Sequence, residues 1–241
     1  MGNEDFDEVI VRKEIIVPMI TINSPINDDL YSDDPPNFNV LIFDINGIDS
    51  MWYLIVGKSM NVIFSSNGTI NQDLWNTVGN GLVTIRFYAN DTFGNQNHRD
   101  VVVEKDTIAP IIVINSPNPN DEFGTTSPAY DISINEPHLD QIWYTLDGGI
   151  TNISITFLSG SIVQTVWDGV SLGAVTITFY ANDTLGNIRF MSVGVAKVIE
   201  PSEPPNLLGI IATILSIIPY HIESIPLRSN IITLKLGGPS P

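Results

Sequence analysis

Short runs in which apolar and polar residues alternate with a period of two make up most of the chain. This is the period of a β-strand that buries one face and exposes the other. The apolar positions of the two clearest runs are Val83, Ile85, Phe87 and Ala89, and Val175, Ile177, Phe179 and Ala181. Other strand-like runs lie at residues 15–22, 38–43, 51–56, 61–65 and 101–104, between clusters of Asp, Asn, Gly, Ser and Pro. Since no long helical stripe interrupts them, the pattern predicts an all-β protein in which Phe87 and Phe179 face inward.

The pattern occurs twice. FYANDTFGN at residues 87–95 returns as FYANDTLGN at residues 179–187, which is an offset of 92. Further matches are INSP at 22–25 and 114–117, Trp75 and Trp167, and, at an offset of 91, Trp52 and Trp143. Because the offset changes by only one residue, the change in length is expected in a loop. The chain therefore contains an internal repeat of about 90 residues.

The repeat divides the chain into five parts. These are an acidic leader at 1–14, repeat 1 at 15–106, repeat 2 at 107–199, a proline-rich stretch at 200–206 and an apolar tail at 207–241. Several short strands in a unit of this length are typical of an antiparallel β-sandwich of the immunoglobulin type. We therefore predict two immunoglobulin-like sandwiches in tandem.

Three segments carry a resemblance to a known family. They are a first strand that follows a proline (APIIVINSP, 109–117), a middle strand with a Trp-Tyr pair (QIWYTLDGG, 141–149) and a late strand that ends in ANDTxGN. Together they resemble the immunoglobulin-like repeats of archaeal and bacterial cell-surface proteins, and the resemblance covers residues 15–199. It implies a spacer, a stalk, a surface-layer component or an adhesive module on a secreted protein. The motifs are signatures of the fold, so they imply more about shape than about activity.

The two ANDTxGN segments have two interpretations. Asp and Asn side chains bond to nearby backbone amides, and Gly94 and Gly186 can adopt a positive φ, so residues 91–95 and 183–187 are suited to hairpin turns. The other interpretation is calcium binding, because Ca²⁺ prefers carboxylate and carbonyl oxygens and the chain is acidic.

The topology of a sandwich indicates where such a calcium site is expected. The turn after the sixth strand, the loop after the second strand and the linker lie at the same end of the second repeat. This arrangement is expected to gather Glu104, Asp106, Glu136, Asp140 and Asp183. Their spacing matches no established calcium motif, so solvated loop acids remain the alternative.

Four Asn-x-Ser/Thr triplets are potential glycosylation sites on a secreted repeat. They start at Asn67, Asn90, Asn152 and Asn182. Asn67 is the preferred site because Asn followed by Gly favours an exposed turn. Asn90 and Asn182 lie at the predicted turns, where a structural role is favoured.

The four tryptophans are expected in the cores, as in other immunoglobulin-like sandwiches. Alternation complicates this expectation for Trp143. If Ile142 and Tyr144 point inward, Trp143 points outward, and an exposed indole beside acidic residues can stack on a sugar ring. Trp143 is thus the basis for an alternative function in carbohydrate binding.

Composition and motifs argue against several other functions. The chain has 27 acidic and 10 basic residues and a net charge of −17, which removes the electrostatic source of nucleic-acid binding. Without cysteine there is no disulfide, thiolate nucleophile or cysteine-ligated zinc. No HExxH, GxGxxG or GxxxxGKS motif is present, and the three histidines are isolated. A glycosidase pair of carboxylates is recognised only by its geometry, so the sequence leaves this one enzyme class open.

The two ends suggest a piece of a surface protein. The leader is acidic and shows no export signal, which would begin with basic and apolar residues. In the tail, residues 207–218 carry no charge, but this run is shorter than the roughly 20 residues of a membrane helix. We interpret it as a truncated membrane anchor, with an unordered tail or an additional strand as alternatives.

These observations lead to one preferred function and one alternative. The first is a non-enzymatic extracellular spacer, structural or adhesive module at a cell surface, with other surface proteins, copies of itself or glycans as partners. Calcium is its expected cation, and its C-terminus is expected to associate with a membrane. The alternative is a carbohydrate-binding accessory region of a secreted enzyme, for which a row of exposed aromatic rings on one sheet would be favourable.

Overall fold

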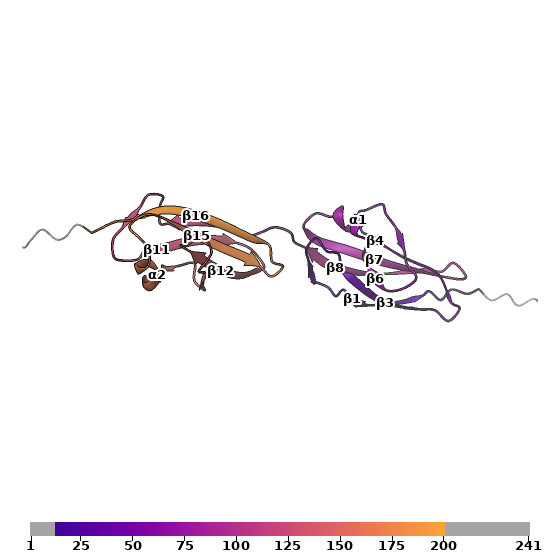
Figure 1. Ribbon diagram of the computed structural model, residues 1–241. Helices are drawn as coiled ribbons and strands as arrows, with labels where there is room; N and C mark the ends of the chain where they lie inside the picture. The colour runs from indigo at the N-terminus through magenta and orange to yellow at the C-terminus, as the bar shows by residue number, and fades with distance from the viewer. Residues whose placement is uncertain (1–12, 201–241) are drawn as a thin grey trace, which may run out of the picture.

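The computed structural model describes residues 13–200, which form two β-sandwiches arranged end to end (Figure 1). The predicted leader up to residue 12, the proline-rich stretch from residue 201 and the apolar tail lie outside the described residues. Between residues 13 and 200, no helix is long and apolar enough to span a membrane. The predicted fold class, two tandem immunoglobulin-like antiparallel sandwiches, is confirmed.

The first sandwich packs a three-stranded sheet, β1-β3-β6, against a five-stranded sheet, β2-β8-β7-β4-β5. Its elements are β1 (Met19–Ser24), β2 (Leu30–Tyr31), β3 (Asn37–Phe43), β4 (Ile48–Ile55), β5 (Val62–Ile63), β6 (Gly68–Thr69), α1 (Gln72–Asn76), β7 (Gly81–Asp91) and β8 (Gln96–Lys105). All strand pairs are antiparallel except the short pair β2–β8. The long strand β7 thus lies between β8 and the middle strand β4, as in immunoglobulin domains.

The second sandwich repeats this arrangement. Its sheets have the orders β14-β11-β9 and β10-β16-β15-β12-β13. Its elements are β9 (Ile111–Ser116), β10 (Glu122–Phe123), β11 (Ala129–Asn135), β12 (Leu139–Thr145), β13 (Ile153–Ile155), β14 (Ser159–Ser161), α2 (Gln164–Asp168), β15 (Gly173–Asp183) and β16 (Ile188–Lys197). The connection between β8 and β9 runs through residues 106–110.

Each sandwich has a core of its own, built from the inward-facing positions of the alternating strands. Phe87 and Phe179 are fully buried, so the prediction that both face inward is confirmed. Trp75 and Trp167 are also fully buried, and they come from the short helices α1 and α2. No residue belongs to both cores.

The expectation that all four tryptophans lie in a core is wrong for Trp52 and Trp143. Both are half-buried and lie on the outer face of the five-stranded sheet. The reason is the strand alternation, because the neighbouring Tyr53 and Tyr144 occupy the inward positions. The outward direction that alternation indicated for Trp143 is confirmed.

Candidate functional site

Three carboxylates meet where the chain enters the second sandwich. One oxygen of each of Asp106, Glu136 and Asp183 lies within 4.8 Å of the others. Asp106 begins the linker after β8, Glu136 follows β11 and Asp183 ends β15. Three segments that are far apart in the sequence therefore contribute to one cluster, which we call the joint cluster.

Local hydrogen bonds hold each carboxylate of the joint cluster in place. Asp183 Oδ1 accepts from the backbone N of Leu185 at 2.9 Å and of Asn187 at 2.8 Å, and its Oδ2 accepts from Asn187 Nδ2 at 2.7 Å. Asp106 Oδ1 accepts from Ile108 N at 2.9 Å. These are Asx-type turns, in which a short acidic side chain bonds to the backbone two residues on.

Glu136 is fixed in the same manner, since its Oε1 accepts from His138 N at 2.9 Å. The linker is also tied to the turn, because Asn187 Nδ2 donates to the backbone O of Asp106 at 3.4 Å. The cluster thus joins the last strand pair of the second sandwich to the chain that enters it.

The charge of the cluster is not balanced by nearby basic groups. Among residues 13–200, no Lys or Arg nitrogen comes within 4.0 Å of these three carboxylates. Negative charges this close repel one another unless a cation lies between them. Oxygen ligands of this kind suit a hard divalent cation such as Ca²⁺, which takes six to eight oxygens in a flexible geometry.

The structure brings together three of the five acids that the sequence indicated. Asp140 is exposed and accepts a hydrogen bond from Asn182 Nδ2 at 3.3 Å, outside the cluster. Glu104 lies at the end of β8, and its Oε2 is 3.4 Å from Nε2 of His138. The expected convergence is therefore wrong for Asp140 and Glu104.

No sequence pattern indicates the contact between Glu104 and His138, because His138 is an isolated histidine in a loop. Only the fold places the second sandwich's His138 beside the first sandwich's last strand. Thr107 is held in a similar way, since Asn80 Oδ1 accepts from its backbone N at 2.8 Å and from its Oγ1 at 3.0 Å. Such contacts limit the motion of the linker against both sandwiches.

A row of aromatic rings crosses the outer face of each five-stranded sheet. In the second sandwich Trp143 stacks on Tyr180 with 5.3 Å between the ring centroids and 2° between the planes, and Phe190 follows at 5.6 Å from Tyr180. In the first sandwich the row is Trp52, Tyr88 and His98, with centroid separations of 5.0 and 5.5 Å. The rings are direct cross-strand partners, which explains why each row runs across the strands.

The four Asn-x-Ser/Thr triplets lie in different environments. Asn67 is exposed, but its Oδ1 accepts a hydrogen bond from the backbone N of Val40 in β3 at 2.8 Å. Asn90 and Asn182 lie at the ends of β7 and β15 and are half-buried. Asn152 is exposed in the loop before β13, so its side-chain amide is more accessible to glycosylation than those of Asn90 and Asn182.

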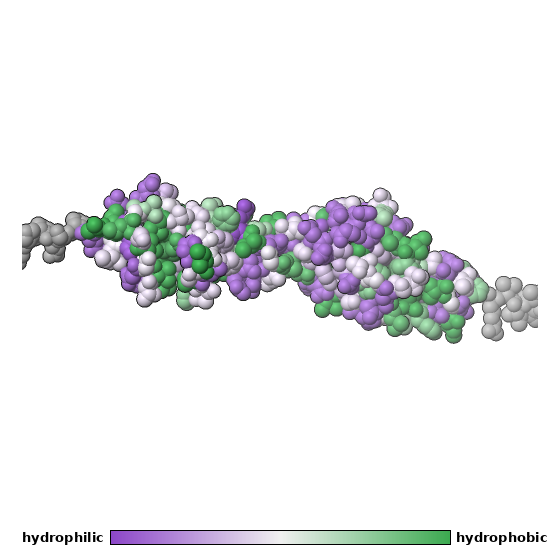
Figure 2. Space-filling view, viewed as in Figure 1, coloured by the Kyte–Doolittle hydropathy of each residue, from purple (hydrophilic) through white to green (hydrophobic). Residues whose placement is uncertain are grey.

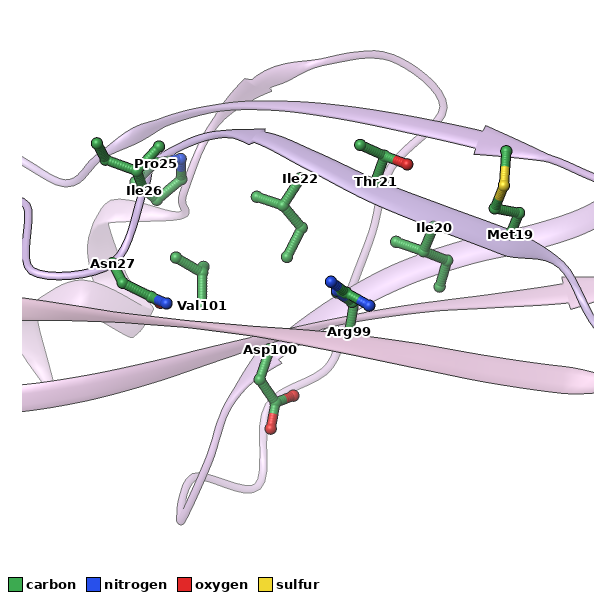
Figure 3. Close-up of a pocket in the computed structure, with 10 residues that line it drawn as sticks. All are labelled: Met19, Ile20, Thr21, Ile22, Pro25, Ile26, Asn27, Arg99, Asp100 and Val101. Atoms are coloured by element: carbon green, nitrogen blue, oxygen red, sulfur yellow. The ribbon is translucent and has the colours of Figure 1, made fainter.

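A cleft of about 480 Å³ lies between β1 and β8 of the first sandwich (Figure 3). Its lining is Met19, Ile20, Thr21, Ile22, Pro25, Ile26, Asn27, Arg99, Asp100 and Val101. Figure 3 shows the side chain of Asp100 pointing away from the cleft. Its carboxylate instead pairs with Arg86, with Arg86 Nε 2.7 Å from Asp100 Oδ1. The lining offers no nucleophile paired with a base, so it has no features of an active site.

No protein-family model matches the chain, and no curated protein matches it either. Among solved structures, the chain is similar to the fibronectin(III)-like modules of Clostridium thermocellum CbhA, with 13% identity over 77% of this chain and 97% of that one and a TM-score of 0.37. A 1.5-MDa bacterial ice-binding adhesin gives 11% identity over 78% and 67% of the two chains and a TM-score of 0.46. The D00-D0 domain of intimin gives 12% identity over 74% and 100% and a TM-score of 0.36. The assignment of the fold therefore rests on the strand orders and the two cores described above.

Proposed function

We propose that the chain is a non-enzymatic extracellular module that spaces or presents a partner-binding surface at a cell surface. The observation that supports this most directly is the end-to-end placement of two sandwiches with separate cores (Figure 1). Each sandwich is about as long as its central strand of 11 residues, or about 36 Å at roughly 3.3 Å per residue. The pair thus spans about 75 Å, which suits a spacer.

The exposed apolar residues of the first sandwich suit an adhesive contact. Figure 2 shows hydrophobic groups gathered on the lower side of this sandwich, where β1 and β3 lie. Met19 and Phe43 are cross-strand partners there and are 57% and 60% exposed, and Leu41 is 57% exposed. Contiguous exposed apolar groups are typical of interaction surfaces. Other surface proteins or copies of this chain are the partners that we propose.

Labelling of intact source cells tests this proposal. An antibody against the chain is expected to bind intact cells, and external protease is expected to remove the signal. An internal protein is the control, which must stay protected. Labelling that requires permeabilised cells would overturn the proposal.

We further propose that Ca²⁺ at the joint cluster stiffens the linker. A cation held by Asp106, Glu136 and Asp183 would tie the first linker residue to the second sandwich, in addition to the existing contact from Asn187. Since the cation binds only the folded arrangement, it would also stabilise that arrangement by mass action. A stiff joint keeps the two sandwiches extended end to end, so that the chain spans their combined length, as a spacer must.

Small-angle scattering of the full chain, with and without millimolar calcium, tests this role. Calcium is expected to narrow the distribution of distances between the sandwiches, and Glu136→Gln is expected to abolish the change. Asp140→Asn is the matched control, because Asp140 lies outside the cluster and its variant should respond like the wild type. A wild-type curve that calcium does not alter would contradict the proposal.

Carbohydrate binding is the second candidate, and the aromatic rows favour it. Phe190 is 61% exposed at the end of the row that Trp143 begins, and flat rings in a row can stack on successive sugar units. The close stacking of Trp143 on Tyr180 argues against sugar binding by Trp143, because it covers one face of the indole.

A glycan array with the full chain separates the two functions. If the row binds sugar, Phe190→Ala and Trp143→Ala should each abolish the signal, whereas Phe157→Ala should not. Phe157 is the control because it is 75% exposed but lies outside the row. Absence of any glycan signal for the wild type would remove this candidate.

A further inference from the structure

Asp44, at the end of β3 in the first sandwich, has an unusual carboxylate. Its exposed fraction is only 8%, and its Oδ1 accepts from Asn46 N at 2.8 Å. Its Oδ2 is buried and has no hydrogen-bond partner among residues 13–200. A buried carboxylate oxygen without a donor is costly, because it has lost water and gained nothing in return. This oxygen therefore points to a ligand.

The internal repeat indicates which ligand. At the offset of 92, Glu14, Asp44 and Asp91 correspond to Asp106, Glu136 and Asp183. The unpartnered Asp44 is thus the counterpart of Glu136, whose carboxylate in the second sandwich lies within 4.8 Å of the other two acids. Asp44 follows β3 just as Glu136 follows β11, so the two acids hold the same position in the repeat.

The hydrogen bonds of the two sets also correspond. Glu14 Oε1 accepts from Ile16 N at 2.7 Å, as Asp106 does from Ile108 N at 2.9 Å. Asp91 Oδ1 accepts from Phe93 N at 2.9 Å and from Asn95 N at 2.8 Å. These match the bonds that Asp183 accepts in the second sandwich. The backbone therefore positions the three acids in the same manner at the start of each repeat.

The two sets of acids differ in the length of their side chains at two positions, and the two differences offset each other. The entering residue is the longer Glu14 in the first sandwich and the shorter Asp106 in the second, while the residue after the second long strand is the shorter Asp44 and the longer Glu136. The number of methylene groups is therefore the same in both sets. The exchange conserves the total length of the three side chains, although among residues 13–200 only Asp106, Glu136 and Asp183 have carboxylate oxygens that all lie within 4.8 Å of one another.

In the first sandwich the amide of Asn95 lies between two of the acids. Its Nδ2 donates to Asp91 Oδ2 at 2.8 Å and also to Glu14 Oε2. Thr92 Oγ1 donates to Asn46 O at 3.0 Å, so the turn that carries Asp44 is held against the turn that carries Asp91. A neutral amide thus donates to Glu14 and Asp91, whereas Asp44 Oδ2 has no donor among residues 13–200.

We propose that Glu14, Asp44 and Asp91 form a second divalent-cation site, which takes Ca²⁺ and which we call the entry site. All its ligands are oxygens, and Asp44 Oδ2 is the ligand that the structure leaves without a partner. The entry site lies at the end of the first sandwich that faces away from the joint. It therefore stabilises the first sandwich itself, and this inference does not depend on stiffening of the joint or on the proposed surface function.

Calcium titration of the full chain, followed by isothermal calorimetry, counts the sites. We expect two calcium ions per wild-type chain, one per Asp44→Asn chain and one per Glu136→Gln chain. Asp33→Asn is the control, because the side chain of Asp33 is 86% exposed and lies in neither set. An Asp44→Asn variant that still binds two ions, or a wild type that binds none or only one that Glu136→Gln removes, would overturn the entry site.

Thermal unfolding with and without calcium separates a ligand from a structural residue. Asp44→Asn keeps an oxygen for Asn46 N and removes a buried charge, so its melting temperature without calcium should equal or exceed that of the wild type. Only the increase caused by calcium should be lost, and only in the unfolding of the first sandwich. A melting temperature that falls equally with and without calcium would assign Asp44 a purely structural role and overturn the proposal. Failure of Glu136→Gln alone would concern the joint cluster and leave the entry site intact.

Discussion

A lysine at the end of the last strand of each sandwich contacts the end of the short helix and shows how one residue can organise a loop. Lys105 is 5% exposed, and its Nζ donates to the backbone O of Trp75 at 3.2 Å and of Val78 at 3.3 Å. The ammonium also lies 5.3 Å from the centroid of the Trp75 ring. Lys197 makes the corresponding contacts with Trp167 and Val170 in the second sandwich. The positive charge satisfies carbonyls that the end of a helix leaves without partners.

Lys105→Met should therefore destabilise the first sandwich. Met fills most of the volume but leaves the carbonyls of Trp75 and Val78 without a donor, and hydrogen bonds to a charged group contribute about 1.5–3 kcal/mol. Urea denaturation of the full chain measures the loss. The exposed Arg99 is the control, since Arg99→Met should change stability by less than about 0.5 kcal/mol. Equal effects of the two substitutions would show that the ammonium contributes nothing specific.

At the scale of elements, the long hairpins β7–β8 and β15–β16 carry the two cores, but their outer faces differ. Arg86 and Asp100 are cross-strand partners in the first hairpin and form two parallel contacts of 2.7 Å. The corresponding partners in the second hairpin are Thr178 and Ser192, whose hydroxyl oxygens are 2.9 Å apart. The first hairpin alone thus has a charged pair at this position.

This pair should make the first hairpin sensitive to acid. The hydrogen bonds from Arg86 outweigh partial burial and, together with the charges of Arg86 and His98, lower the pKa of Asp100 below its ordinary value of 3.8. A carboxylate with a lowered folded-state pKa stabilises the fold above its unfolded pKa, and this contribution is lost as the pH falls through the folded value. We expect about 0.5–1 kcal/mol at neutral pH, because the pair is partly exposed.

The double variant Arg86→Thr/Asp100→Ser copies the second hairpin and supplies the test. Denaturation at pH 7 and at pH 2 to 3 should show that the variant loses stability relative to the wild type only at pH 7. A difference that persists unchanged at low pH would mean that packing of the arginine stem, rather than the charge, is responsible.

At the scale of the whole molecule, the separate cores predict separate unfolding. Phe179→Ala leaves a cavity in the second core alone, so it should cost about 3–5 kcal/mol there and leave the first sandwich unchanged. Differential scanning calorimetry should resolve two transitions, of which only one shifts.

Two comparisons make this measurement decisive. Phe87→Ala should shift the other transition by a similar amount, because Phe87 has the equivalent place in the first core. Phe157→Ala should shift neither, since Phe157 is 75% exposed. A single transition that moves as a whole in both core variants would show that the two sandwiches unfold as one unit.

Much of the architecture follows from local features of the sequence. The period of two in residues 83–89 and 175–181 requires sheet, and the offset of 92 requires that the sheet occur twice. The outward direction of Trp143 follows from the same alternation, because neighbouring residues of a strand point to opposite faces. The turns at 91–95 are also local, since Asp91 bonds to amides two and four residues away.

The tertiary structure decided the contacts between residues that are far apart in the chain. Asp106, Glu136 and Asp183 meet whereas Asp140 does not, because the direction of a side chain at a loop depends on the register shift between Leu139 and Gln141. The burial of Lys105 and the unpartnered oxygen of Asp44 likewise depend on elements that pack against them from elsewhere. The sequence by itself determined two immunoglobulin-like sandwiches, because alternation and repetition are properties of neighbouring residues. Only the packed fold determined which of the 27 acidic residues lie together, because that depends on distances that no local pattern encodes.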